Sequence, residues 1–326
     1  MSKSTEEIQS IFTKFSVPKP QQTEEIYEKL GYKDSIPTPL PYFVMTNTSK
    51  TQTTEVASRI KVGKKLKGLK VIGWYGPPGT GKNTLAKEIA ATLRMPYREF
   101  DLGQGFDLME LIGGTGLRGN QGATETVAVE GPLTTYAKIG SIISLNEVVN
   151  VDGIQLSILH AMIQEREISL PTAETGPNGN QSVVKVHDDT FFVFTWNPDL
   201  RNPDRQMPPP ALLDRMRARR FDTDTEEDEV NKLTSRLKFA LDKHVNPDAV
   251  RDDVRLIRNL RKAYENGHIA RCPYMRTLED FALTRHTLGN EAAFEVLLNL
   301  CDQDPEEFYR QRDDVVRRHF QPIFGK

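Results

Sequence analysis

The sequence predicts an α/β fold built on a parallel sheet, followed by a smaller domain made only of helices. Between 69 and 224, short apolar runs typical of buried strands alternate with helical patterns. Such alternation favours parallel strands joined by right-handed crossovers. From 226 to 320 the sequence shows only helical periodicity. A glycine-rich segment ending in lysine follows the first apolar run, so we expect a phosphate-binding site on this sheet.

Length and composition favour a soluble protein of two or three domains. The chain has 326 residues, and domains usually have about 100–200 residues. Its 43 basic and 45 acidic residues give a net charge of −2, which does not support a general nucleic-acid binder but leaves room for a local basic groove. The two cysteines exclude a disulfide framework, and no apolar run reaches the roughly 18 residues of a membrane span. Since no signal peptide is recognisable, we expect a cytoplasmic protein without membrane insertion.

The segment 1–68 is predicted to be peripheral. Helical patterns cover 8–15 and 23–30, and the stretch 35–54, rich in proline, threonine and serine, is typical of an extended linker. A run of lysines follows, which we interpret as a solvated face or, alternatively, as a phosphate or subunit contact: Lys61, Lys64, Lys65, Lys67 and Lys70.

Periodicity predicts the elements of the other two domains. In the core domain, 69–224, we expect strands at 69–75, 96–102, 141–145, 190–196 and 218–224, and helices at 83–93 and 154–166. In the helical domain, 225–326, we expect helices at 230–241, 247–265, 277–288, 291–300 and 305–320.

A phosphate-binding loop is predicted between the strand 69–75 and the helix 83–93. Glycines let successive backbone N–H groups point at phosphate oxygens, and the helix N-terminus adds the positive end of its dipole. The strand before the loop and the helix after it favour a ligand site over an ordinary glycine-rich turn. The loop and the helix start comprise Gly76, Pro77, Pro78, Gly79, Thr80, Gly81, Lys82, Asn83 and Thr84.

The residue after the loop lysine departs from the usual pattern. A serine or threonine is expected after Lys82, because its hydroxyl holds Mg²⁺, but this chain has Asn83. An amide oxygen can also hold the ion, so Asn83 is a candidate metal ligand. Thr84 lies one residue further on, about 100° around the helix, and therefore points elsewhere.

A second part of the site is predicted at the end of the strand 141–145. Two acids at the end of such a strand usually complete the Mg²⁺ shell and activate water. Here the two positions are Asn146 and Glu147. We expect Asn146 to hold Mg²⁺ more weakly than a carboxylate does, and Glu147 to act on water. The alternative for Glu147 is an ordinary acid at a strand end.

A polar residue at the end of another strand and several arginines are further candidate site residues. Asn197 comes directly after the strand 190–196, where it could orient water against a γ-phosphate. Arg215 ends a helical pattern, and Arg276 begins another in the helical domain. Either arginine could instead be a plain surface charge. Three more lie beside the first: Arg217, Arg219 and Arg220.

The motifs described above, and the order in which they occur along the chain, resemble those of the AAA+ ATPases. They are most similar to the MoxR branch, with its CbbQ, NorQ, GvpN and dynein-related relatives. The resemblance covers about 69–290. It is carried by GPPGTGKNTLAKEIA, EGPLTTYAKIGSIISLNEV, QLSILHAMIQEREISLP, FVFTWNP, ALLDRM and the helix of Arg276. It implies a P-loop NTPase core of three layers, α/β/α, with an all-α lid.

The resemblance also implies roles for single residues, with ATP and Mg²⁺ as cofactors. Lys82 binds phosphate and Glu147 activates water. Asn197 is the first sensor and Arg276, on the lid, is the second. Arg215 is the finger that reaches into the neighbouring subunit's site, although the three arginines beside it are alternatives.

Two insertions of this family face a central pore. The glycine-rich stretch 113–126 corresponds to the first, and we expect it to depart from helix and sheet. The second corresponds to a hairpin of 168–170 with 183–186 around the loop 172–181.

Two functions remain open. The first is a homo-oligomeric ring, by default hexameric, that couples ATP hydrolysis to remodelling of a protein client or adaptor. The second is a nucleotide-dependent assembly switch with little hydrolysis, because Asn83 and Asn146 weaken the Mg²⁺ site. We favour the first, since a water-activating acid, sensors and a finger have no purpose in a pure binder. A nucleic-acid partner has only the lysine run and Arg118 in its support.

Overall fold

The chain forms two units, which we describe separately. The computed structural model describes 3–103, 107–120, 123–151, 153–170, 183–198, 208 and 210–325. The core unit comprises Met1–Leu40, Thr48–Pro77 and Gly81–Asp222. The helical unit comprises Pro41–Asn47, Pro78–Thr80 and Thr223–Lys326.

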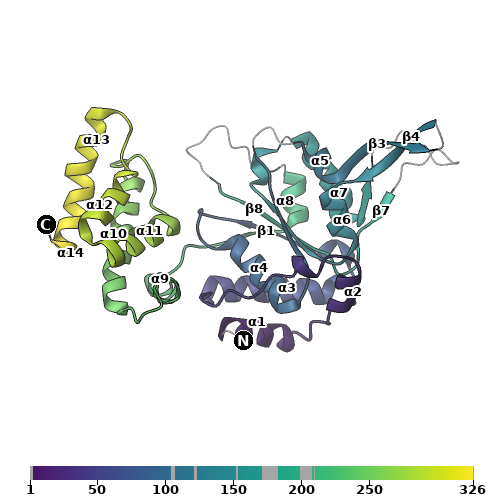
Figure 1. The fold of residues 1–326 in the computed structure, drawn as a ribbon, viewed down its shortest axis with the longest axis horizontal. Coiled ribbons are helices and arrows are strands. Elements are labelled where there is room, and N and C mark those ends of the chain that lie inside the picture. Colours follow the sequence, from purple (N-terminus) through teal and green to yellow (C-terminus); the bar gives the residue numbers. More distant parts are fainter. Residues whose placement is uncertain are drawn as a thin grey trace. The chain divides into compact units, whose positions relative to one another are not determined.

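The described part of the core unit is built on a parallel sheet of five strands (Figure 1). In the spatial order β2-β5-β8-β1-β9 they are Tyr97–Asp101, Ile142–Asn146, Phe191–Trp196, Val71–Tyr75 and Ala218–Arg220. β5 and β8 are buried along their whole length, which explains their continuous apolar runs. The parallel pairing confirms the predicted α/β class.

The pairing register brings the carboxyl ends of four strands together. Asp101 on β2 pairs with Asn146 on β5, which pairs with Thr195 on β8. Thr195 in turn pairs with Trp74 on β1. The segments that follow β1, β5 and β8, where the sequence predicted polar site residues, therefore start at the same edge of the sheet.

Helices cover both faces of this sheet, as Figure 1 shows. On one face lie α4 (Lys82–Leu93) and α3 (Asn47–Gly63), with α1 (Lys3–Lys14) packed against α4. On the other face lie α6, α7 and α8, which span Pro132–Lys138, Gly153–Gln164 and Pro210–Met216. The core unit therefore has the three layers expected of its class.

The N-terminal residues are tied to the sheet, and one expectation for them is wrong. The helices predicted near 8–15 and 23–30 are confirmed as α1 and α2 (Glu24–Lys29). The stretch 35–54 is not an extended linker throughout, because α3 begins at Asn47. A tertiary contact stabilises this polar helix, because the buried Arg59 donates a hydrogen bond to Val71 O of β1 (3.0 Å). Within the helix, Arg59 also donates to Glu55 Oε1 (2.9 Å). Three-residue 3₁₀ turns flank α3, η1 (Lys33–Ser35) and η2 (Lys67–Leu69).

Two antiparallel hairpins extend from the core unit. We expected the stretch 113–126 to depart from helix and sheet, and this expectation is wrong. The described part of this stretch lies in β3 (Gly113–Asn120) and in β4 (Ala123–Glu130), which pair with each other. The sequence of β4 has two threonines and two valines, which favour strands, so it can pair with the glycine-rich β3. The predicted second hairpin is confirmed as β6 (Glu167–Ser169) with β7 (Val183–Lys185). The loop 172–181 between them lies outside the described residues. The short helix α5 (Leu108–Ile112) and the turn η3 (Val148–Asn150) complete this unit.

The helical unit has its own apolar core. Its helices α9–α12 are Glu226–Leu241, Pro247–Glu265, Met275–Leu288 and Asn290–Leu298. The single helix predicted at 305–320 is instead α13 (Pro305–Gln311), a π-helical turn (Arg312–Arg317) and α14 (Arg318–Phe324). The apolar stripe of α10 is buried and packs against α9, α11 and α14, as its helical spacing predicts. Of the helices that the structure describes, none is long and apolar enough to cross a membrane.

A buried ion pair joins two helices of the helical unit and supports a stability prediction. Asp253 on α10 is fully buried and accepts hydrogen bonds from Arg285 Nε (2.5 Å) and Nη2 (2.9 Å) on α11. Asp253→Ala leaves the guanidinium buried without its partner, so we expect the free energy of unfolding to fall by about 3–5 kcal/mol. Urea unfolding of the full chain, followed by circular dichroism, measures the loss. Asp314→Ala removes the exposed pair with Arg318 and serves as control, with an expected loss below about 1 kcal/mol. Equal losses in the two variants contradict the prediction.

Candidate functional site

The predicted phosphate loop joins β1 to α4, and its backbone requires glycine. Gly76 has a φ of 156°, and a Cβ placed there lies 2.2 Å from the carbonyl oxygen of Phe221. Gly81 has a left-handed φ of 97° and forms the N-terminal cap of α4. These two residues let the chain turn from the buried strand into the helix, whose N-terminus faces the loop.

Lys82 is buried at the centre of this loop. Its side chain is 7% exposed, and Nζ donates hydrogen bonds to Gly76 O (2.9 Å), Pro77 O (2.9 Å) and Asn197 Oδ1 (2.8 Å). Burial lowers the pKa of Lys82 to about 8, and the negative charge of Glu147 only partly opposes this shift. The ammonium group is thus held in place by acceptors but is poorly stabilised as a charge.

Asn197 connects the lysine to the predicted water-activating acid. Its Oδ1 accepts from Lys82, and its Nδ2 donates to Glu147 Oε1 at 2.5 Å. The strand order explains this bridge, because β8 lies between β1 and β5. Glu147 has a left-handed φ of 56° just after β5. Its Oε2 is buried, and no hydrogen-bond partner for it is found among the described residues.

Asn146 is held by four neighbours. Its Oδ1 accepts from Ser144 Oγ (2.9 Å) and Thr195 Oγ1 (3.0 Å). Its Nδ2 donates to Glu99 Oε1 (2.6 Å) and Asp101 Oδ1 (2.8 Å). Ionised carboxylates only accept hydrogen bonds, so the amide nitrogen must face them and the amide oxygen must face the hydroxyls.

Asn83 meets the same carboxylate. Its Nδ2 donates to Glu99 Oε1 at 2.8 Å, so one carboxylate oxygen accepts from both asparagines that the sequence proposed as metal ligands. The two positions are therefore brought together, but through their amide nitrogens.

The sequence-based prediction missed Glu99 and Asp101. Both side chains are exposed, and both belong to β2. A signal was present, because acids two residues apart on a strand share one face of the sheet. The sequence does not reveal that β2 pairs with β5, and this pairing is what places the two acids beside Asn146.

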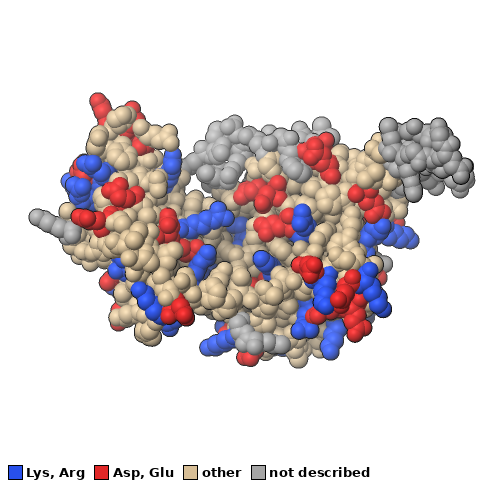
Figure 2. Space-filling model, in the orientation of Figure 1, with Lys and Arg blue, Asp and Glu red and all other residues tan. Residues whose placement is uncertain are grey.

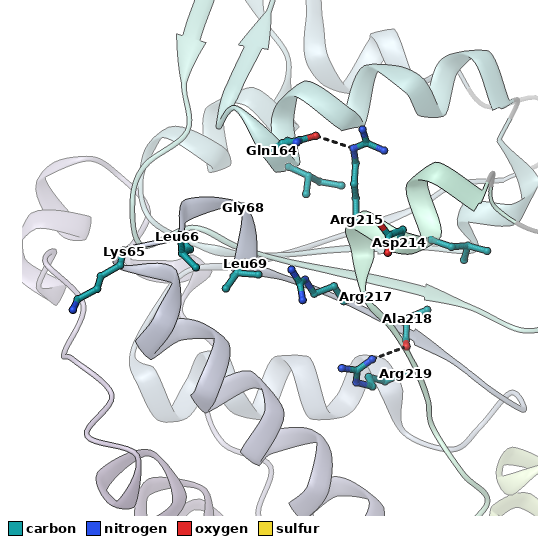
Figure 3. A pocket seen from close by; sticks show the side chains of 12 residues that line it. Lys65, Leu66, Gly68, Leu69, Gln164, Asp214, Arg215, Arg217, Ala218 and Arg219 are labelled. Carbon is teal, nitrogen blue, oxygen red and sulfur yellow. Dashed lines mark hydrogen bonds between the residues drawn. The ribbon is translucent and has the colours of Figure 1, made fainter.

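Arg215 lies in a different pocket of the core unit (Figure 3). This pocket has a volume of about 880 Å³, and its basic lining residues are Lys65, Arg215, Arg217 and Arg219. Arg215 donates to Gln164 Oε1 (2.9 Å) and to the carbonyl oxygen of Ala211 (2.8 Å). The lining includes neither the loop lysine nor the acid after β5. Arg220, the remaining candidate finger, is outside this lining and pairs with Asp222 at 2.9 Å.

Other predicted site residues belong to the helical unit. Arg276 is exposed in the first turn of α11, where it acts electrostatically on Glu279. Pro78, Gly79 and Thr80 of the phosphate loop group with this unit by their contacts. The pairing of Arg276 with a nucleotide stays a prediction.

Comparisons with known proteins show what the core unit is similar to. Residues 74–216 match the family model of the AAA domain, dynein-related subfamily. Protein NorQ of Paracoccus denitrificans is 31% identical over 127 residues, which cover 39% of this chain and 43% of that protein. Protein CbbQ of Hydrogenophilus thermoluteolus is 32% identical over 123 residues, which cover 38% and 42%. An uncharacterized protein of Staphylococcus saprophyticus is 28% identical over 92 residues, which cover 28% and 35%. The alignments thus span less than half the length of these relatives.

The matched segment contains the phosphate loop, Glu147, Asn197 and Arg215, while the helix of Arg276 lies beyond it. The match and the two named relatives confirm the predicted resemblance to MoxR-type AAA+ proteins. Residues 74–216 are therefore similar to the AAA domain of the dynein-related subfamily.

Proposed function

We propose that this protein is an ATPase that assembles into a ring, by default a hexamer, and couples ATP binding and hydrolysis to remodelling of a protein partner. The observation that carries the proposal is the hydrogen-bonded chain from Lys82 through Asn197 to Glu147. Its members come from the segments that follow three neighbouring strands, β1, β8 and β5. It joins a phosphate-binding cation to a carboxylate able to act on water. The match to the AAA domain supports nucleotide binding at the edge of the sheet where β1, β5 and β8 end.

In this proposal the chain's own residues divide the hydrolysis between them. The loop N–H groups and Lys82 bind the phosphates of ATP. Glu147 orients a water molecule and accepts its proton as the oxygen attacks the γ-phosphorus, while the bond to the leaving ADP oxygen breaks. Glu147 Oε2, buried and unpartnered among the described residues, is the free acceptor for that water. Asn197 keeps the carboxylate beside the lysine.

The basic pocket of Figure 3 is the proposed contact with a neighbouring subunit. A finger that acts across an interface commonly contributes about 10³–10⁵ in rate. Arg215 is our candidate, because it ends α8 and lines the pocket. Arg217, with a left-handed φ of 51°, lines the same pocket and is the alternative. Arg219 is less suited, since it pairs with Glu55 at 3.2 Å.

The partner is proposed to be a protein. The hairpins β3–β4 and β6–β7 are the candidate client contacts, by the resemblance to pore loops. Figure 2 shows acidic and basic side chains interspersed on the face drawn, whereas a nucleic-acid groove gathers basic side chains. The face drawn therefore gives no support to a nucleic-acid groove.

A nucleotide-dependent switch with little hydrolysis is the second candidate. It is favoured by one observation, that Asn83 and Asn146 present amide nitrogens rather than oxygens toward Glu99. A switch of this kind binds nucleotide and assembles, but turns it over slowly.

The pKa of Lys82 predicts that nucleotide affinity falls as the pH rises above about 8. A bound phosphate stabilises the ammonium form, so at higher pH the complex must take up a proton that free protein lacks. Between pH 7 and pH 9 we expect an affinity loss of about tenfold. Titration of the full chain with a fluorescent ADP, without metal, measures it. In Lys82→Arg the guanidinium stays charged, so its profile is expected to be flat. A flat profile for the unaltered protein contradicts the prediction.

Mixing two inactive variants tests the ATPase and the ring together. Glu147→Gln keeps its contact with Asn197 but loses the base, so turnover should fall at least about 100-fold while ADP still binds. The turnover of Arg215→Ala should fall by a similar factor. In a mixed ring, an intact Glu147 can meet Arg215 of its neighbour, so turnover should partly return. The specific activity of the unaltered protein should also rise with its concentration.

The surface variant Arg94→Ala, which removes only an exposed pair with Glu24, is the control and should keep its activity. If turnover survives both Glu147→Gln and Lys82→Ala, the proposed ATPase is wrong. If Arg215→Ala keeps its turnover while Arg217→Ala loses it and recovers when mixed with Glu147→Gln, the finger is Arg217. A lack of turnover in the unaltered assembled protein, with ADP bound, favours the switch.

A further inference from the structure

The two asparagines of the nucleotide site meet at one carboxylate. Glu99 Oε1 accepts from Asn83 Nδ2 at 2.8 Å and from Asn146 Nδ2 at 2.6 Å. These asparagines occupy the positions after the loop lysine and at the end of β5, where AAA+ relatives carry a hydroxyl and a carboxylate. The carboxylate that lies between the two positions comes from the neighbouring strand, β2.

Asn146 is badly placed to hold a cation. Its oxygen accepts from two hydroxyls, and it is 2% exposed. Rotating the amide by 180° points its oxygen at Glu99 and Asp101, which repel it unless they are protonated. The arrangement therefore makes this residue a support for the two carboxylates.

Glu99 and Asp101, in contrast, are well placed to hold a cation. Both side chains are exposed, so a hydrated cation can approach them. Glu99 is also oriented by Tyr97, whose hydroxyl donates to Oε2 at 3.2 Å. Among the described residues this is the one donor to Oε2, so a lone pair remains there.

The number of carboxylates also suits Mg²⁺ carried by a nucleotide. In the part of the chain that the structure describes, no group of three or more histidine, cysteine, aspartate or glutamate side chains is arranged to hold a metal ion. Mg²⁺ at phosphate sites uses one or two carboxylates and completes its shell with phosphate oxygens and water. Two carboxylates beside the phosphate loop meet that demand.

We infer that Glu99, with Asp101 beside it, supplies the carboxylate of the Mg²⁺ site, and that Asn146 is a positioning residue that holds both acids. The negative charge that relatives place at the end of β5 has moved to the adjacent strand β2. The inference rests on the proposed nucleotide binding and deepens it, because it names the residues that hold the metal of the nucleotide.

Mn²⁺ binding to the ADP complex of the full chain tests this assignment. Mn²⁺ reports its own binding by electron paramagnetic resonance, and fluorescent ADP reports nucleotide affinity with EDTA. Glu99→Gln keeps an oxygen for the asparagines but loses the charge. We expect it to weaken Mn²⁺ binding about 10- to 100-fold and to leave metal-free ADP affinity within about twofold. Glu25→Gln, an exposed acid on α2, is the matched control and should change neither value.

A rescue variant separates a ligand role from a structural one. Adding Asn146→Asp to Glu99→Gln returns a carboxylate to the end of β5, so Mn²⁺ affinity should recover at least about tenfold. A merely structural role of Glu99 predicts no such recovery, because the second change removes a further hydrogen-bond donor.

The contrary outcomes are distinct. If Glu99→Gln binds ADP and Mn²⁺ like the unaltered protein, the assignment is wrong and the proposed nucleotide site stands. Tighter Mn²⁺ binding in Glu99→Gln also overturns it, and shows that Glu99 blocks the site. If the unaltered protein binds no ADP, with or without Mn²⁺, the proposed function fails and the assignment fails with it.

Discussion

The register of four parallel strands is the constraint on which the site depends. Because Asp101, Asn146, Thr195 and Trp74 lie side by side, the segments after β1, β5 and β8 begin at one edge. The lysine after β1 and the acid after β5 are then bridged by a residue that follows the strand between them. A shift of one residue in any pair turns its side chains to the opposite face and separates these groups.

The buried ammonium of Lys82 couples the loop to the acid. Its donors are occupied by two carbonyls of its own loop and by Asn197. A phosphate that binds here must replace at least one of these contacts, because an ammonium group has three N–H donors. Since Asn197 also holds Glu147, a change at the lysine reaches the carboxylate through one side chain. In the proposed ATPase, phosphate binding and water activation would therefore be linked through this one side chain.

The sequence predicted the features that depend on neighbouring residues in the chain. It did not predict those that depend on contacts between segments far apart in the chain. β5 and β8 were predictable because burial on both faces demands unbroken apolar runs. The start of α3 was missed, since its polar residues depend on contacts such as that of Arg59 with β1. Lys82, Glu147 and Asn197 follow from their places after strands. Glu99 was missed because its contact with Asn146 depends on the pairing of β2 with β5.

The neutral side chain at 146 has a physical reason within this network. With aspartate there, three carboxylates would meet at hydrogen-bond distance from one another, and like charges so close raise each other's pKa and oppose folding. An amide has two N–H groups to give, and Asn146 gives one to Glu99 and one to Asp101. Its oxygen meanwhile satisfies the buried hydroxyls of Ser144 and Thr195. Asn146, at a position where an acid was expected, thus allows two acids to lie close together on the neighbouring strand, because it donates a hydrogen bond to each.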